Sequence, residues 1–294
     1  GLAAALLAVH GLAAAADAPP TYSRVVGTER TYRVRRGETL AHVAAVTGQD
    51  AARIAAANRL ADPKHLRPGS ELVISDLRIV PDREGATGQR LVINLGERAV
   101  YWLEDDALRE RIVVAIGKRG WETPTGEYTV TGRRLDPVWH VPKSIQREMA
   151  RKGLPVKTTV APGRDNPLGR FWISLSAAGV GLHGTNQKNS LGRTASHGCI
   201  RLPDGAIERL YHELPDGAPV TIIDEPVKLA HLADGRVLLE VHADAYPEKA
   251  RASREDHVEQ IASAAGIPPD RLDWERVRRA LPKAWGVALD VTAD

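Results

Sequence analysis

The most informative part of this 294-residue sequence is TASHGCIRL, residues 194–202, together with GLHGTN, residues 181–186. The first stretch contains Cys199, the only cysteine of the chain, and the second places His183 sixteen residues before it. A free thiol has a pKa near ~8.5, and a neighbouring imidazole or cationic group can lower that value to ~3.5–7.5. We therefore predict that Cys199 is a nucleophile and that His183 and His197 are the groups that activate it.

The backbone around the cysteine is suited to the same chemistry. Gly198 allows the chain to turn tightly before Cys199, and the amides of these two residues could form an oxyanion hole for an acyl-transfer intermediate. Arg201 adds positive potential two residues after the thiol. A thiolate, a base and backbone donors are the parts that a thioester mechanism requires.

The cysteine also has two simpler interpretations. Most lone cysteines are small buried hydrophobic residues. Cys199 could also bind zinc with His183 and His197, but the contiguous His-Gly-Cys spacing fits none of the common zinc patterns and no fourth ligand stands out. His, Gly, Ser and Arg surround the thiol, and this polar neighbourhood favours the nucleophile. We expect neither a metal nor an organic cofactor.

These residues closely resemble the signature of the L,D-transpeptidase catalytic domain (the YkuD-type family). That signature is a His, a gap of about sixteen residues to Cys, and Ser/Thr-His-Gly-Cys followed by an apolar residue and Arg or Asn. Residues 120–128 resemble the Thr-Pro-x-Gly turn of the family, and residues 165–169 resemble the segment before its catalytic His. The resemblance extends over about residues 89–225, and the positions that match the signature are His183, Ser196, His197, Gly198, Cys199 and Arg201.

The resemblance implies cysteine-based cross-linking of peptidoglycan. Cys199 would attack the carbonyl between the third residue of a stem tetrapeptide and its terminal D-Ala. His183 would take the thiol proton and later activate the acceptor amine, while the carbonyl of Gly184 would hold the imidazole in place. The amides of Gly198 and Cys199 would stabilise the oxyanion.

Other side chains would complete the pocket. Ser196 and His197 would shape it, and Arg201 would steer a substrate carboxylate by a bidentate contact. Large aromatic residues more often pack than bind. Three tryptophans are nevertheless candidates for lining the substrate groove: Trp121, Trp139 and Trp172. Of these, Trp139 is selected as a substrate-binding residue.

Several acceptors are compatible with the sequence. Residues 223–228 and 240–242 resemble the C-terminal part of periplasmic members that carry a LysM module and attach Braun lipoprotein to the wall through a terminal Lys, whereas the helical tail after Ser253 departs from that pattern. The enzyme could also form 3-3 cross-links, or use water as an L,D-carboxypeptidase or a hydrolase of wall-protein attachments. A non-catalytic wall-binding protein is a further alternative, against which the intact His183 and Cys199 argue.

A second module is predicted over residues 30–75. A strand at 31–34, helices at 40–46 and 51–58, and a strand at 71–74 give a small α+β unit of type βααβ. It resembles a LysM domain, a module that usually binds the N-acetylglucosamine-containing backbone of peptidoglycan or chitin. The matching positions support the fold better than the binding: Val34, Gly37, Glu38, Thr39, Leu40, Ile54, Asn58, Leu66, Pro68, Gly69 and Leu72.

The rest of the chain divides by composition. Residues 1–18 are small and apolar and end in Ala-rich tripeptides, which is typical of a signal peptide and predicts a periplasmic protein. Residues 76–88 are polar and contain Pro and Gly, which indicates a linker. Successive short strands over residues 89–225 predict a mainly β catalytic domain of the β-sandwich type. Residues 226–294 are predicted to form a hairpin and a helical tail.

Composition excludes several classes of function. Hydrophobic residues make up 43% and charged residues 26% of the chain, as in a globular protein. Forty Lys and Arg against 37 Asp and Glu give a formal charge of +3 that is spread along the chain, which argues against a nucleic-acid partner. No apolar run reaches the ~18–20 residues of a membrane span. A mildly basic protein is attracted to an anionic polymer such as peptidoglycan.

Overall fold

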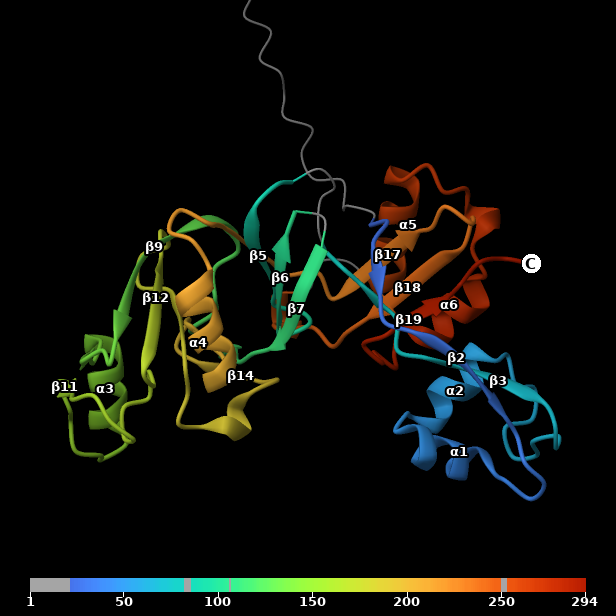
Figure 1. Cartoon of the computed structure of the whole chain (residues 1–294), viewed down its shortest axis with the longest axis horizontal. Helices are drawn as coiled ribbons and strands as arrows, with labels where there is room; N and C mark the ends of the chain where they lie inside the picture. The colour runs from blue at the N-terminus through green and yellow to red at the C-terminus, as the bar shows by residue number, and fades with distance from the viewer. Residues whose placement is uncertain (1–21, 82–85, 106, 250–252) are drawn as a thin grey trace, which may run out of the picture.

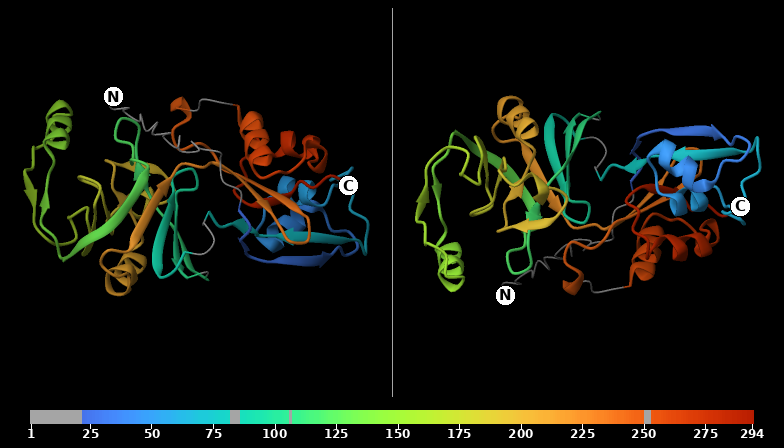
Figure 2. Two further views of the ribbon diagram at one scale, coloured as in Figure 1. Left: turned by 90° about the horizontal axis from the view of Figure 1, so that it is seen from above. Right: turned by 90° about the horizontal axis from the view of Figure 1, so that it is seen from below.

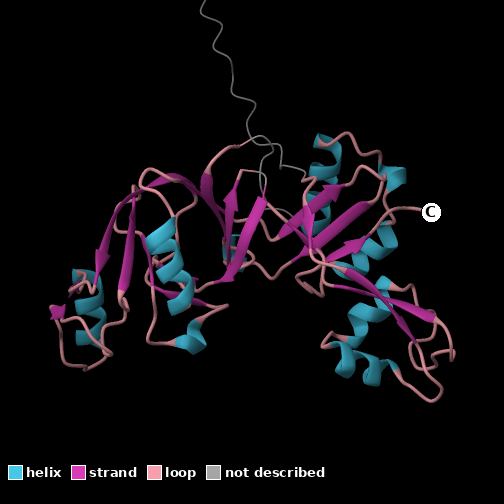
Figure 3. Cartoon of the chain, viewed as in Figure 1, coloured by secondary structure: helices cyan, strands magenta, loops and turns pink. Residues whose placement is uncertain are grey.

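A computed structural model describes residues 22–81, 86–105, 107–249 and 253–294, so the expected signal peptide at residues 1–18 lies outside the described residues. The chain is mainly β, as the sequence predicts (Figure 3). A large sheet occupies one part of the molecule, and the LysM-like and C-terminal units lie together at the other end (Figure 1), as Figure 2 also shows. Within the described ranges, no helix is long and apolar enough to cross a bilayer.

Eight strands form one continuous sheet in the order β15-β13-β12-β9-β16-β5-β6-β7. Neighbouring strands are antiparallel, except that β5 runs parallel to β16 and β13 runs parallel to β15. The strands are β5 (Gln89–Asn94), β6 (Ala99–Glu104), β7 (Ala107–Val113), β9 (Gly126–Leu135), β12 (Phe171–Leu175), β13 (Gly181–His183), β15 (Ile200–Arg201) and β16 (Pro219–Ile223).

Side chains from both ends of this sheet share one apolar core. Leu91 of β5, Ile173 of β12 and Leu182 of β13 are fully buried in the same cluster. Helix α4 (Asp204–Glu213) contributes Ile207 to it. Strands at opposite ends of the sheet therefore pack face to face, which is the layered β arrangement that the alternating strands predict.

Short elements surround the cysteine. Strand β8 (Ile116–Gly117) runs parallel to β14 (Thr194–Ser196), and the 3-10 turn η1 (Lys188–Ser190) precedes β14. We call residues 139–160 the capping segment. It consists of β10 (Trp139–His140), α3 (Lys143–Arg151) and β11 (Thr159–Val160), with β10 and β11 paired.

The LysM-like unit has the predicted order of elements: β2 (Glu29–Arg33), α1 (Leu40–Thr47), α2 (Ala51–Ala57) and β3 (Glu71–Ser75). Each helix begins at a side-chain cap, because Thr39 Oγ1 accepts from the His42 amide at 3.3 Å and Asp50 Oδ1 accepts from the Arg53 amide at 2.9 Å. The small core is made of Val34, Leu40, Val43, Ile54, Leu72 and Ile74.

The C-terminal unit is a three-stranded sheet covered by helices, with its own apolar core. The predicted hairpin is present, and a third strand that the sequence did not indicate completes the sheet. This third strand has only three residues, which are too few to show the alternation of buried and exposed side chains that marks a strand. The elements are β17 (Val227–His231), β18 (Val237–Val241), η2 (Pro247–Lys249), α5 (Arg254–Ala264), η3 (Pro269–Arg271), α6 (Trp274–Ala280) and β19 (Ala288–Asp290).

The stretch expected to be a linker, residues 76–88, begins with ordered structure. Strand β4 (Arg78–Ile79) pairs with β1 (Val25–Val26), and Ile79 is completely buried against the C-terminal sheet. Strand β4 has only two residues, which is too short to show an alternating pattern in the sequence. The partners that bury Ile79 are also far away in the chain, so its burial could not be predicted locally. The start of the segment that follows the LysM-like unit is therefore packed between the catalytic domain and the C-terminal unit.

Candidate active site

Six of the predicted site residues line one cavity of about 660 Å³, and Gly184 and Gly198 are not among its lining residues. It lies between the capping segment and the edge strands of the large sheet. The parallel register of β13 and β15 sets His183 beside Arg201. The cavity also has lining residues that the sequence did not select, among them Ile145 and Met149 of α3. The predicted residues that line it are Trp139, His183, Ser196, His197, Cys199 and Arg201.

His183 is buried, and its ring contacts the Gly184 carbonyl and Trp172. Its Nδ1 lies 2.6 Å from the carbonyl oxygen of Gly184, and Trp172 stacks on its ring with centroids 5.7 Å apart. A carbonyl oxygen only accepts a hydrogen bond, so Nδ1 carries the proton and Nε2 of the neutral ring is a base. Burial lowers the pKa of His183 to about 4, so the ring is neutral at pH 7.

The thiol of Cys199 is in its protonated form. Its Sγ donates a weak hydrogen bond to the carbonyl oxygen of Gly179 at 3.5 Å. Burial raises the pKa of Cys199, and this outweighs a backbone hydrogen bond from Gly181 and the charge of Arg201, which act in the opposite direction. Burial thus acts against the charged form of both groups, which is compatible with the expected transfer of the thiol proton to His183.

Ser196 closes the turn that carries the cysteine. Its Oγ accepts from the Gly198 amide at 3.2 Å and donates to the Cys199 carbonyl in a short hydrogen bond. Gly198 has a φ of +104°, a conformation that favours glycine. The expectation of two oxyanion donors is corrected, since the Gly198 amide is already bonded to Ser196. The Cys199 amide makes no hydrogen bond within the described residues.

His197 contacts an acidic residue that the sequence analysis missed. Its Nε2 lies 2.8 Å from Glu148 Oε2. The ring of Trp121 packs edge-on against the imidazole, with the two ring centroids 4.8 Å apart. Glu148 also binds Lys118 at 3.1 Å and Lys152 at 2.7 Å. Glu148 belongs to α3, 49 residues before His197, so no local signal links the two residues. This ion-pair cluster joins the capping segment to the turn that carries the cysteine.

Arg201 lines the cavity and has a hydrogen-bond donor that is not used by any described residue. It is 9% exposed, and one of its terminal nitrogens donates to Gln187 Oε1 at 3.0 Å. Its Nε is buried without a partner among the described residues. A guanidinium at the wall of a cavity attracts an anionic ligand.

Comparison with known proteins agrees with this geometry. Residues 88–222 match the L,D-transpeptidase catalytic domain (YkuD), and residues 32–75 match the LysM domain. The protein named "Probable L,D-transpeptidase ErfK/SrfK" of Salmonella typhimurium is 33% identical, over 98% of this chain and 94% of its own length. The chain belongs to the L,D-transpeptidase family. The Escherichia coli protein with the same name as the Salmonella relative is 32% identical to this chain, over 99% of this chain and 95% of its own length.

A third relative, named "Probable L,D-transpeptidase YcfS", from Escherichia coli is 34% identical over 82% of this chain and 76% of its own length. The Salmonella alignment covers 98% of this chain, so it includes most of the helical tail after Ser253. The tail was expected to depart from the pattern of the lipoprotein-attaching members, and most of it is aligned with the Salmonella protein.

The protonated thiol of this L,D-transpeptidase predicts a specific pH dependence. Because burial raises the pKa of Cys199, alkylation by iodoacetamide is expected to accelerate with rising pH up to and beyond pH 9, without a plateau between pH 5 and 7. The rate is measured by intact mass across pH 5–10. The urea-unfolded chain is the control, and the midpoint of its curve of alkylation rate against pH is expected at a lower pH than that of the folded protein. A maximal rate already at pH 6 would instead indicate a thiolate paired with an imidazolium.

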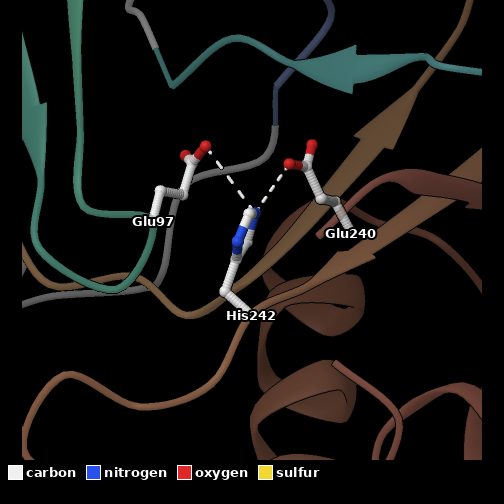
Figure 4. Close-up of side chains that lie close together, drawn as sticks. All are labelled: Glu97, Glu240 and His242. Carbon is white, nitrogen blue, oxygen red and sulfur yellow. Dashed lines mark hydrogen bonds and ion pairs between the residues drawn. The ribbon is translucent and has the colours of Figure 1, made fainter. Parts of the chain in front are cut away.

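One cluster of potential metal ligands lies outside the active site. Glu97, Glu240 and His242 bring their ligand atoms within 4.8 Å of one another, and His242 Nε2 contacts both carboxylates at 3.6 Å and 2.7 Å (Figure 4). The buried ammonium of Lys228 lies 2.7 Å from Glu97 and 3.3 Å from Glu240. It supplies the positive charge that a metal ion would bring, so the arrangement fits an internal ion-pair network.

Proposed function

We propose that this L,D-transpeptidase transfers the acyl group of a peptidoglycan stem tetrapeptide to an amine through a thioester on Cys199. The observation that carries the proposal is the neutral pair of Cys199 and His183 in one cavity, in which Nδ1 of the imidazole is occupied by Gly184. This leaves Nε2 as the nitrogen that can take a proton. A neutral base and a partly buried thiol support general-base catalysis, in which the proton leaves sulfur as the sulfur–carbon bond forms.

The first half of the reaction forms the thioester. Cys199 Sγ attacks the carbonyl carbon between the third residue and the terminal D-Ala, and His183 Nε2 accepts the thiol proton. The amide of Cys199 donates to the resulting oxyanion. When the carbon–nitrogen bond breaks, the same proton passes from His183 to the amine of D-Ala, which leaves.

The second half releases the product. The acceptor amine attacks the thioester carbonyl and loses a proton to His183 Nε2. The carbon–sulfur bond then breaks, and the proton returns to the sulfur of Cys199. Because neutral His183 is restored at the end, one imidazole serves as base and acid in both halves. No step requires a metal or an organic cofactor.

Arg201 is proposed to bind a substrate carboxylate, such as the one that ends the tetrapeptide. Its Nε lacks a partner in the described chain, and its charge is buried beside the cavity. A carboxylate that pairs with Nε and a terminal nitrogen would satisfy the guanidinium. Trp139 of the capping segment lines the same cavity and is proposed to contact the stem peptide.

The LysM domain is proposed to hold the enzyme on the glycan strands of peptidoglycan. Binding there raises the effective concentration of stem peptides near Cys199 without any change in the chemistry. We place the protein in the periplasm, where its substrate lies and where a signal peptide at residues 1–18 would direct it. A lipoprotein with a terminal Lys is a proposed acceptor, beside the amine of a second stem peptide.

The test of this proposal is an acceptor competition assay. The enzyme is incubated with a synthetic stem tetrapeptide alone, with a second stem peptide, or with a peptide that ends in Lys, and products are followed by mass spectrometry. We expect D-Ala release in every case and an amide product that exceeds the hydrolysis product whenever an amine is present. Hydrolysis alone in the presence of both amines would contradict transpeptidation and identify a carboxypeptidase.

A further inference from the structure

The threonine of the Thr-Pro-x-Gly turn contacts the backbone of the cysteine-bearing turn directly. Thr123 Oγ1 donates to the carbonyl oxygen of Gly198 at 2.9 Å and accepts from the Gly117 amide at 2.9 Å. We propose that Thr123, held in turn by Tyr246 of the C-terminal unit, is a positioning residue that orients the Cys199 amide toward the substrate oxyanion. This inference rests on the proposed function, because only an acyl-transfer reaction forms that oxyanion.

Thr123 controls the orientation of the peptide unit between Gly198 and Cys199. A trans peptide is planar, with its carbonyl and its N–H on opposite sides. When Thr123 holds the carbonyl of Gly198, the N–H of Cys199 must therefore point away from Thr123. That N–H makes no hydrogen bond with any residue that the structure describes. Thr123 thus fixes the direction of the Cys199 N–H, which is a hydrogen-bond donor beside the sulfur.

The turn needs an external support of this kind. Gly198 has a φ of +104° and no side chain, so its backbone is the most adaptable point of the turn. Ser196 holds the Cys199 carbonyl and the Gly198 amide from within the turn. The Gly198 carbonyl is held from outside, by Thr123. An oxyanion donor is effective when its direction is set before the reaction begins, because no reorganisation is then required.

Tyr246 extends this support to the C-terminal unit. Its hydroxyl accepts from the Thr123 amide at 3.1 Å and donates to the Gly117 carbonyl at 3.0 Å. It is 6% exposed, and it packs in the core of the large sheet although it follows strand β18 of the C-terminal unit. Residue 246 lies beyond residues 88–222, which match the catalytic domain. The C-terminal unit therefore supplies a residue that supports the active-site turn.

The test compares two reactions of the same thiol. Acylation by a carbapenem passes through an oxyanion, whereas alkylation by iodoacetamide is a displacement at carbon that forms none. Thr123→Val removes the hydroxyl and keeps the shape of the side chain, and Thr123→Ser retains the hydroxyl. Both rates are measured by intact mass on the full chain at one pH, for these variants and for Tyr246→Phe.

We expect Thr123→Val to acylate about 10- to 100-fold more slowly while its alkylation rate stays within about twofold of the parent, since loss of one oxyanion donor costs up to about 10²–10³. Thr123→Ser is expected to restore most of the acylation rate, and Tyr246→Phe to slow acylation less than Thr123→Val. An unchanged acylation rate, or an equal fall in both rates, would overturn the inference. If the parent protein is alkylated but never acylated, the proposed function itself fails.

Discussion

Replacing Cys199 by alanine is expected to abolish D-Ala release and transfer, and replacing His183 by glutamine to lower the transfer rate by about 10²–10⁴-fold. Cys199 is the only thiol in the chain, so no neighbour can replace it. Glutamine at position 183 retains a polar side chain but provides no base at neutral pH. The measurement is the initial rate of product formation from a synthetic tetrapeptide and an amine acceptor.

His197→Gln is the matched control for the base. His197 lines the same cavity, but its Nε2 is engaged with Glu148 at 2.8 Å. We therefore expect a smaller loss of rate from His197→Gln than from His183→Gln. If the order were reversed, His197 would be the base and the assignment of His183 would be wrong. A Cys199→Ala protein that still transferred the acyl group would exclude the thioester altogether.

Replacing Lys228 by methionine is expected to destabilise the protein by about 3–5 kcal/mol, because it leaves buried carboxylates without their central cation. Lys228 is fully buried between Glu97 and Glu240 and also donates to the carbonyl of Ile79. Burial acts to lower the pKa of Lys228, but Glu240 and Glu97 outweigh it and raise that pKa above its ordinary value. The ammonium is therefore charged, and a neutral side chain cannot replace it.

The loss is measured from urea unfolding curves. Lys64→Met, at an exposed lysine, is the control and is expected to change stability little. Adding Glu240→Gln to Lys228→Met is expected to recover part of the loss, since one of the two carboxylate charges that faced the ammonium is removed. A Lys228→Met protein as stable as the parent would show that Glu97 and Glu240 do not need the Lys228 ammonium beside their contacts with His242 (Figure 4), against the account of Lys228 as the central cation of this network.

Local signals explain why much of the fold could be predicted. The helices of the LysM domain begin at Thr39 and Asp50, whose caps lie within three residues of the amides that they bind. The strands that are long enough to show a pattern, such as β12 with its alternating burial, were also predicted. By contrast, β13 and β15 carry His183 and Arg201 on only three and two residues, and their pairing depends on the complete sheet.

The site residues were predictable because their chemistry is rare in this chain. A single cysteine in Ser-His-Gly-Cys, sixteen residues after His183, identified the candidate nucleophile and base. Contacts across long distances in the sequence were not predictable. They include Glu148 on His197, and the donation from Gly198 to Ser196, which removes an expected oxyanion donor. The protonation of Cys199 depends on burial, which the sequence does not show.

The most direct test of the central claim, that Cys199 is an acylated nucleophile, is the intact mass of the full chain after incubation with a carbapenem. The β-lactam carbonyl of such a drug forms a thioester when a thiol attacks it. We predict one adduct per chain in the parent protein, slow formation in His183→Gln and none in Cys199→Ala. A folded parent protein without an adduct, or an adduct that persists in Cys199→Ala, would contradict the claim.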